Sequence, residues 1–251
     1  MPTRTMTVQN LKNLQGSDLD ATVWRYFPFA KFISVLTYQA LWFCKLNVLQ
    51  DKFEGMIPGK PPEWITTNER DGRELTLVNC WFLGDSESMK MWETYGASPE
   101  GVAVKSTVRK LMQYVYVPAG PHMSHIGKVL YVKHDSYDME PYLAHQAHER
   151  AFLKDERYGN EKELRIETMN LKGMSCISKY GTPLTLEECQ GKNMNNFDNP
   201  GLYFMIDLRH LPSGFVVAPH AHEWFELLVR RIVEALCIPA PVTRSALEPQ
   251  P

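Results

Sequence analysis

Two glutamates and an arginine alternate along one short segment of the chain, at Glu161, Glu163 and Arg165. A β-strand directs every second side chain to the same face, so a strand here would place all three together. Two carboxylates in line repel each other, and an adjacent guanidinium offsets this repulsion and keeps at least one of them charged. Such a row can stabilise an oxocarbenium-like transition state at a sugar carbon. The alternative interpretation is the solvated face of an edge strand.

A second motif combines a hydroxyl with two aromatic rings, at Ser88, Trp92 and Tyr95. Offsets of four and seven residues place the three side chains on one face of a helix. Aromatic rings beside a hydroxyl suit a flat ligand with a polar edge, such as a nicotinamide or a nucleobase. The alternative interpretation is a stripe that packs into the core.

The third motif is the run Trp24, Arg25 and Tyr26. On a strand the arginine points away from its two aromatic neighbours. Its planar fork of donors could hold a phosphate or an amide, or it could be a surface arginine between two core aromatics.

A metal site has less support in the sequence than the three motifs above. Asp51 and Glu54 form an acidic pair in a predicted loop, and they could orient a ligand or cap a turn. Histidines recur in three close pairs, but no H-E-x-x-H motif occurs. The pairs are 122/125, 145/148 and 220/222. We therefore predict no metal site.

The elements that must position these residues include more strands than helices. Strands are predicted near 23–27, 41–44, 75–82, 102–104, 129–132, 164–166, 204–206 and 215–217. Helices are predicted over 30–38, from an N-cap at Asp85 or Ser86 to Tyr95, over 142–153 and over 222–236. Because strands and helices do not alternate regularly, the sequence favours an α+β fold with a mixed or antiparallel split sheet flanked by helices.

The composition of the chain is typical of a soluble globular protein. The sequence of 251 residues is 44% hydrophobic and 22% charged, close to the averages for a soluble globular protein. We predict a polar leader over 1–20, a single domain over 21–238 and a disordered Pro-rich tail over 239–251.

Charge and cysteine usage narrow the function classes and the compartment. A net charge of -2 argues against a purely electrostatic nucleic-acid binder. Five widely spaced cysteines without a C-x-x-C motif indicate a reducing compartment. No signal peptide or membrane span is recognisable, so we expect a cytoplasmic protein without a membrane partner.

Several blocks together resemble the uncharacterised family catalogued as domain of unknown function 2971. They lie at 24–27, 41–43, 51–55, 79–82, 88–95, 101–104, 161–166 and 216–219, and the resemblance covers roughly residues 22 to 236. The order and spacing of these blocks carry the resemblance, and the family name implies no activity.

A more distant resemblance is to the ADP-ribosyltransferases. Their three-part signature has a first-strand Arg or His, a central aromatic or serine, and a late glutamate. The resemblance implies that Arg25 holds NAD, that Ser88 and Tyr95 line the nicotinamide pocket and that Glu163 is catalytic. Glu161 would help to position the acceptor, while Tyr26 and Trp92 flank the same NAD site. The sequence departs from the signature because no Ser-Thr-Ser stretch stands on a central strand.

The favoured hypothesis is an ADP-ribosyltransferase-like enzyme that consumes NAD and modifies an unknown acceptor, with a protein and a nucleic acid both open. A toxin and a phage-defence effector both fit this reading. One alternative is a non-catalytic binding protein in which Arg25, Trp92 and Glu163 form a buried network. A third reading is a hydrolase or nuclease that uses Asp51, Glu54, Glu161 and Glu163 with a divalent metal.

Overall fold

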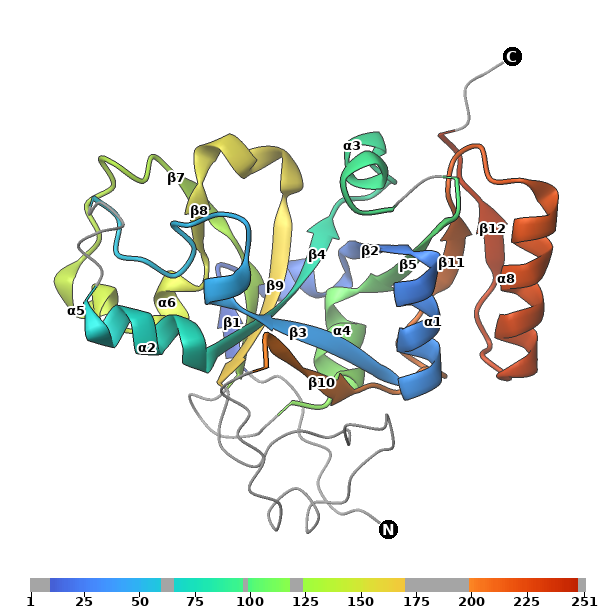
Figure 1. Ribbon diagram of the computed structural model, residues 1–251, viewed down its shortest axis with the longest axis horizontal. Coiled ribbons are helices and arrows are strands. Elements are labelled where there is room, and N and C mark those ends of the chain that lie inside the picture. Colours follow the sequence, from blue (N-terminus) through green and yellow to red (C-terminus); the bar gives the residue numbers. More distant parts are fainter. Residues whose placement is uncertain (1–9, 60–65, 97–98, 118–123, 170–198, 248–251) are drawn as a thin grey trace, which may run out of the picture. The chain divides into compact units, whose positions relative to one another are not determined.

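The computed structural model describes residues 10–59, 66–96, 99–117, 124–169 and 199–247 (Figure 1). These residues form two compact units made of interleaved segments of the chain. The first unit takes its residues from 1–14, 41–80 and 116–205, and the second from 15–40, 81–115 and 206–251. Both units combine helices with strands of a mixed sheet, which confirms the predicted mixture of helix and sheet. The prediction of a single domain over 21–238 stays a prediction.

The first unit is organised around strand β9, which is buried on both faces. β9 has β6 and β4 as neighbours, and β1 lies parallel to β6 at the edge. β3 pairs with β4 and with β10. These strands are β1 (Asn10–Lys12), β3 (Ala40–Lys45), β4 (Thr76–Leu83), β6 (Ser124–Lys128), β9 (Glu163–Met169) and β10 (Gly201–Met205).

A separate two-stranded ribbon and several short helices complete the first unit. β7 (Leu130–Val132) runs parallel to β8 (Leu153–Asp155), and the 3₁₀ turn η5 (Glu156–Glu161) leads from β8 towards β9. The other helical segments are η2 (Leu46–Val48), α2 (Thr67–Leu75), α5 (Pro141–Ala144) and α6 (Ala147–Arg150). Strand β8, the end of η5, β9 and the turn after η2 supply the charged side chains of the candidate site.

In the second unit, β5 lies between β2 and β11, antiparallel to both, and β12 is parallel to β11. The end of β4 pairs with β2. The strands are β2 (Thr22–Pro28), β5 (Gly101–Thr107), β11 (Gly214–Val217) and β12 (Val242–Arg244). The helical segments are η1 (Gly16–Asp20), α1 (Phe29–Tyr38), α3 (Met89–Met91), the π-helical turn η4 (Trp92–Gly96), α4 (Val108–Tyr114) and α8 (Glu223–Ala235).

Helix α8 lies beside β11 and β12 (Figure 1). It buries Phe225, Val229 and Val233, which are spaced four residues apart. The helix was predicted from another set of apolar residues, and most of these are exposed: Trp224, Leu227, Leu228 and Leu236. The helix prediction is confirmed, but periodicity alone does not identify the face that packs.

The helix predicted over 142–153 is wrong in its length and in its end. Gln146 has an extended backbone between α5 and α6, and Leu153 begins strand β8 instead of ending a helix. The guanidinium of Arg150 explains part of the break, because its Nη1 atom donates to the carbonyl of Ala144 at 2.5 Å. This bond satisfies a backbone carbonyl in the last turn of α5, so the helix can end there.

The helix predicted to start at Asp85 or Ser86 begins later, with Ser88 as its N-cap. The Ser88 hydroxyl accepts a hydrogen bond from the backbone N–H of Met91. From Trp92 the turn widens into a π-helix, and this shifts the angular position of later residues. Trp92 is 1% exposed whereas Tyr95 is 42% exposed, so the predicted common face does not form.

The ends of the described chain also differ from expectation. The leader predicted over 1–20 contains strand β1 and the turn η1. Within the segment predicted as a disordered tail, β12 forms because its backbone extends the sheet. Phe215 N–H donates to the carbonyl of Pro241, and Ser245 N–H donates to that of Val217.

Candidate functional site

The predicted row of acidic and basic residues is buried in the first unit, not solvated. Glu163 and Arg165 alternate on β9, and the Glu163 Oε2 atom accepts from Arg165 Nε at 3.0 Å and Nη2 at 2.5 Å. Glu54, from the turn after η2, lies 2.7 Å from Arg165 Nη1. The interpretation of this face as solvent-exposed is therefore wrong.

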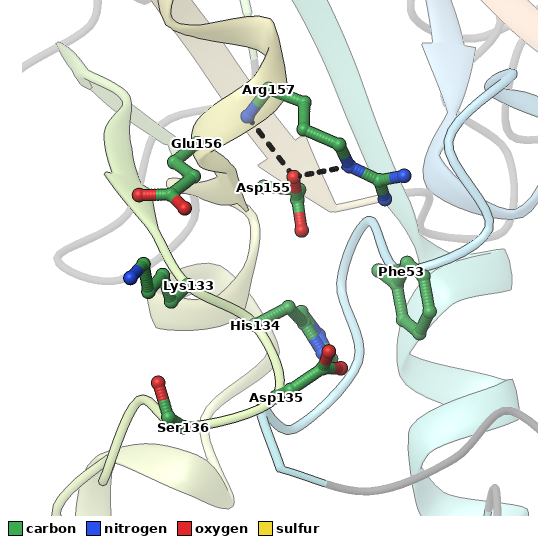
Figure 2. Close-up of a pocket in the computed structure, with 8 residues that line it drawn as sticks. All are labelled: Phe53, Lys133, His134, Asp135, Ser136, Asp155, Glu156 and Arg157. Carbon is green, nitrogen blue, oxygen red and sulfur yellow. Dashed lines mark hydrogen bonds and ion pairs between the residues drawn. The ribbon is translucent and has the colours of Figure 1, made fainter.

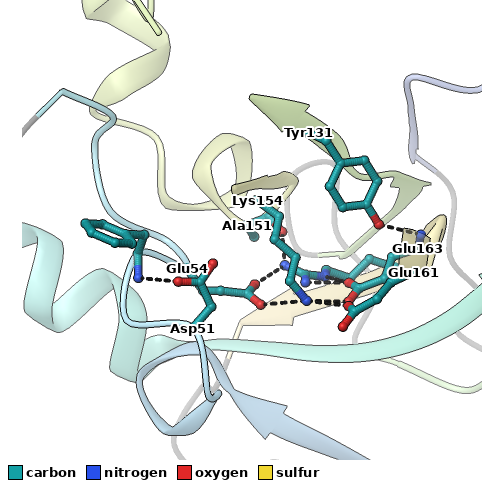
Figure 3. Close-up of polar contacts among 9 residues, drawn as sticks. Asp51, Glu54, Tyr131, Ala151, Lys154, Glu161 and Glu163 are labelled. Atoms are coloured by element: carbon teal, nitrogen blue, oxygen red, sulfur yellow. Dashed lines mark hydrogen bonds and ion pairs between the residues drawn. The ribbon is translucent and has the colours of Figure 1, made fainter. Parts of the chain in front are cut away.

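A lysine that sequence reasoning missed joins the carboxylates together. Lys154 Nζ, on β8, lies 2.6 Å from Glu161 Oε2, 2.8 Å from Glu163 Oε1 and 3.3 Å from Glu54 Oε1 (Figure 3). We call Glu54, Lys154, Glu161, Glu163 and Arg165 the charge cluster. It contains three carboxylates and two cations, so its members neutralise one another only incompletely.

Glu161 and Glu163 are adjacent carboxylates in different environments. Burial raises the pKa of Glu161 to about 7, and its hydrogen bond with Glu163 acts in the same direction. Burial would also raise the pKa of Glu163, but the charges of Arg165 and Lys154 hold it well below its usual range. Near neutral pH the Glu161 carboxyl is therefore divided between its protonated and ionised forms, while Glu163 stays ionised.

The two glutamates also differ in backbone conformation. Glu161 ends η5, Lys162 has φ +39° in the left-handed region, and only then does the strand begin at Glu163. The prediction of one continuous strand through all three residues is thus wrong at Glu161. Glu161 keeps 16% side-chain exposure, against 7% for Glu163. The Tyr131 phenol oxygen fixes the start of the strand by accepting from the Glu163 N–H at 2.8 Å.

The turn that carries Asp51 and Glu54 is held in place by Arg150. The Arg150 Nε atom donates to the carbonyl of Gly55 at 2.8 Å. Gly55 has φ +74°, and a Cβ added there would lie 2.8 Å from Leu46 Cδ1, so the position needs glycine. Asp51 accepts from the Phe53 N–H at 3.0 Å within the same turn.

A hollow of about 530 Å³ opens beside the charge cluster, and it is lined by Phe53, by residues 133–136 after β7 and by residues 155–157 (Figure 2). Phe53 precedes Glu54 and Asp155 follows Lys154, so the turn and β8 contribute to both features. The lining consists of Phe53, Lys133, His134, Asp135, Ser136, Asp155, Glu156 and Arg157. We call this hollow the His134 pocket.

The remaining predicted residues belong to the second unit. The Tyr26 hydroxyl accepts from the Ser88 N–H at 2.9 Å, and its ring meets Trp92 edge-on at 4.8 Å. Trp92 is buried and its Nε1 atom donates to Glu87 at 2.9 Å. Tyr26 and Trp92 thus form core, with the Ser88 backbone against them, whereas Tyr95 is 42% exposed.

Arg25 lies on the other face of β2. Its guanidinium carbon is 5.3 Å from the centre of the Phe27 ring and 6.0 Å from that of Trp81. Since neighbouring residues on a strand point to opposite faces, Arg25 does not share the environment of Tyr26. The structure therefore brings together Tyr26, Ser88 and Trp92 in one group, and Glu54, Glu161, Glu163 and Arg165 in another.

Within the described ranges no group of three or more His, Cys, Asp or Glu side chains is arranged to hold a metal ion. His125 Nδ1 is instead bonded to Glu167 at 2.8 Å, and its ring stacks on His148 at 4.7 Å. His122 lies outside the described residues.

Across the part of the chain that is described, no helix has the length and apolarity needed to traverse a bilayer.

Sequence reasoning missed Lys154, Tyr131 and His134. One signal for Lys154 was available, because three acids with a single arginine leave a buried row without enough positive charge. Tyr131 and His134 carry no comparable local pattern.

Comparison with models of known protein families, with curated proteins and with solved structures gives no match to this chain.

Proposed function

We propose that this chain is an ADP-ribosyltransferase-like enzyme that cleaves the glycosidic bond between ribose and nicotinamide in NAD. The observation that carries the proposal is the Glu161–Glu163 pair, whose environments drive the two pKa values apart. Neighbouring carboxyl groups separated in this way are typical of acid–base sites. The more distant resemblance of three motifs to the three-part signature of ADP-ribosyltransferases supplies the substrate.

In this proposal the two carboxyl groups have different roles from those that the resemblance implies. The negative charge of Glu163 is already balanced by Arg165 and Lys154, so it has little left with which to stabilise a cationic ribose. Glu163 acts instead as a positioning residue that holds Glu161 and Lys154. Glu161, with partial exposure and a pKa near neutrality, is the group suited to exchange a proton.

The C1′–N bond of NAD breaks, and nicotinamide leaves as a neutral molecule with the bonding electron pair. A nucleophilic oxygen or nitrogen of the acceptor forms a bond to C1′ and loses a proton to ionised Glu161. Protein, nucleic acid and water all remain open as acceptors.

Nicotinamide release from NAD by the purified protein, alone and with cell extract, tests the proposal. Glu161→Gln is expected to lower the rate by about 10²–10⁴-fold, the usual contribution of a general base. Glu93→Gln is the matched control, since Glu93 is exposed and belongs to η4. No release by the unmodified protein, or equal release by Glu161→Gln, would contradict the proposal.

A second candidate function is that of a binding protein without chemistry. Its support is the burial of Glu163 with two cationic partners, which a structural ion-pair network also requires. On this reading Glu161→Gln and Glu163→Gln change only stability, and NAD is not consumed.

A further inference from the structure

Neither ring nitrogen of His134 is satisfied within the described part of the protein. His134 is 4% exposed, and neither Nδ1 nor Nε2 has a hydrogen-bond partner there. Buried polar groups in proteins are nearly always hydrogen-bonded, so an unpaired one indicates that something else uses it. Figure 2 shows the imidazole between Asp155, Phe53 and Asp135, directed into the pocket that these residues line.

The backbone around His134 is fixed, so the ring is presented in one place. The Gly59 N–H donates to the carbonyl of His134 at 2.7 Å, and the N–H groups of Ser136 and Tyr137 both donate to the carbonyl of Lys133. On the facing wall Asp155 accepts from the backbone N–H of Arg157 at 3.0 Å and from its Nε at 2.7 Å. A preformed pocket of this size falls within the range of small-molecule sites, roughly 300–1,000 Å³.

An aromatic surface lies next to the unpaired nitrogens. The ring centre of Phe53 is 4.4 Å from that of His134, and the two planes are inclined by 40°. A flat ligand can stack on one ring while its edge reaches the other. Burial lowers the pKa of His134, so the imidazole is neutral at physiological pH and offers one donor and one acceptor.

The charges of the lining exclude a strongly anionic ligand. Two of the lining residues are cationic and three are acidic. One of the cations, Arg157, is already bonded to Asp155 at 2.7 Å. A phosphate or sulfate would therefore find no excess of positive charge.

We infer that the His134 pocket binds an uncharged planar nitrogen heterocycle of the nucleobase type, which stacks on Phe53 and forms a hydrogen bond with one ring nitrogen of His134. This site is separate from the Glu161–Glu163 chemistry, so its test is binding, whereas the test of the proposed function is nicotinamide release.

Isothermal titration with adenosine, guanosine, cytidine and uridine, each alone, tests the inference. At least one nucleoside binds the unmodified protein, and its 5′-monophosphate binds no more tightly. Ribose and inorganic phosphate, as probes of the other parts of a nucleotide, do not bind. If no nucleoside binds, or if phosphate binds as well as the best nucleoside, the assignment is overturned.

Two variants locate the binding. His134→Phe keeps a ring but removes both nitrogens, and it weakens binding of that nucleoside at least tenfold. Phe53→Leu removes the stacking surface and weakens it by a similar factor, so the inference stays testable should either variant fail to fold. His210→Phe is the matched control, because His210 is exposed, pairs with Asp207 and belongs to the second unit. Unchanged affinity in folded His134→Phe or Phe53→Leu overturns the inference.

Discussion

The ammonium nitrogen of Lys154 lies 2.8 Å from a carboxylate oxygen of Glu163, and both side chains are buried. Their attraction links β8 to the start of β9 and offsets part of the cost of removing two charges from water. A buried pair broken on one side leaves the other charge without compensation, and that is where such pairs affect stability most.

Lys154→Met should therefore destabilise the protein by about 3–5 kcal/mol, the usual cost of removing one partner from a buried ion pair. Methionine retains the apolar length of the side chain, so the loss reports the charge and not the packing. Urea unfolding measures the effect. Lys52→Met, at an exposed position of the neighbouring turn, is the control. A loss no larger than that of the control would show that Lys154 is not a structural partner.

The raised pKa of Glu161 predicts how stability depends on pH. The folded state binds this proton more tightly than the unfolded chain, whose pKa is near 4.5. The resulting stabilisation is fully present below pH 4.5 and is lost as the pH rises through about 7. A shift of this size corresponds to roughly 3 kcal/mol at most.

Glu161→Gln, which stays neutral, should flatten the decline in unfolding free energy between pH 5 and pH 8. The contribution of Glu163 to stability changes with pH in the opposite direction. Because its pKa is lowered in the folded state, this contribution is present above pH 4.5 and is lost as the pH falls further. The two effects thus occupy different pH ranges. Urea unfolding of the unmodified protein and of the variant at pH 5 and at pH 8 measures the decline. An equal decline in both proteins would refute the raised pKa of Glu161.

Local patterns predicted most of the strands, and long-range contacts explain what they missed. Alternating or continuous apolar runs identified β2, β3, β4 and β11, because the signal lies within each segment. Helix α2 has no apolar face to detect. It begins where Thr66 and Glu69 form a capping box, and Glu69 also accepts from the Ile57 N–H at 3.1 Å.

Part of the candidate site was also predictable from local patterns, whereas the residues that join it through long-range contacts were not. The alternation of Glu163 and Arg165 is visible in the sequence, and the structure confirms that the two lie together. Lys154 directly follows the segment predicted to be helical and belonged to no predicted motif, and Glu54 reaches the cluster from one hundred or more residues away. Trp92 and Tyr95 were assigned to one face because a π-helical turn gives no recognisable sequence signal.

Gly55→Ala and Gly59→Ala form a matched pair. Both glycines have positive φ, +74° and +78°, so alanine is strained at either position. Only at Gly55 does the added Cβ meet packed atoms, 2.8 Å from Leu46 Cδ1, whereas nothing lies within 4 Å at Gly59. Gly59→Ala should cost about 1 kcal/mol from backbone strain, and Gly55→Ala about 1–3 kcal/mol more from overpacking. Thermal melts compare them, and equal losses would mean that the turn relaxes freely.

Helix α8 allows a test of which apolar face packs. Val229 is buried and Leu227 is 52% exposed, although Leu227 belongs to the set that predicted the helix. Val229→Ala should lower the unfolding free energy by about 1–2 kcal/mol, since it removes two buried methyl groups and leaves a gap. Leu227→Ala removes more carbon from a position already in contact with water and should change stability by less than about 0.5 kcal/mol. Urea unfolding of the two variants side by side decides between the faces. A larger loss in Leu227→Ala would mean that the face carrying Leu227 is covered in solution.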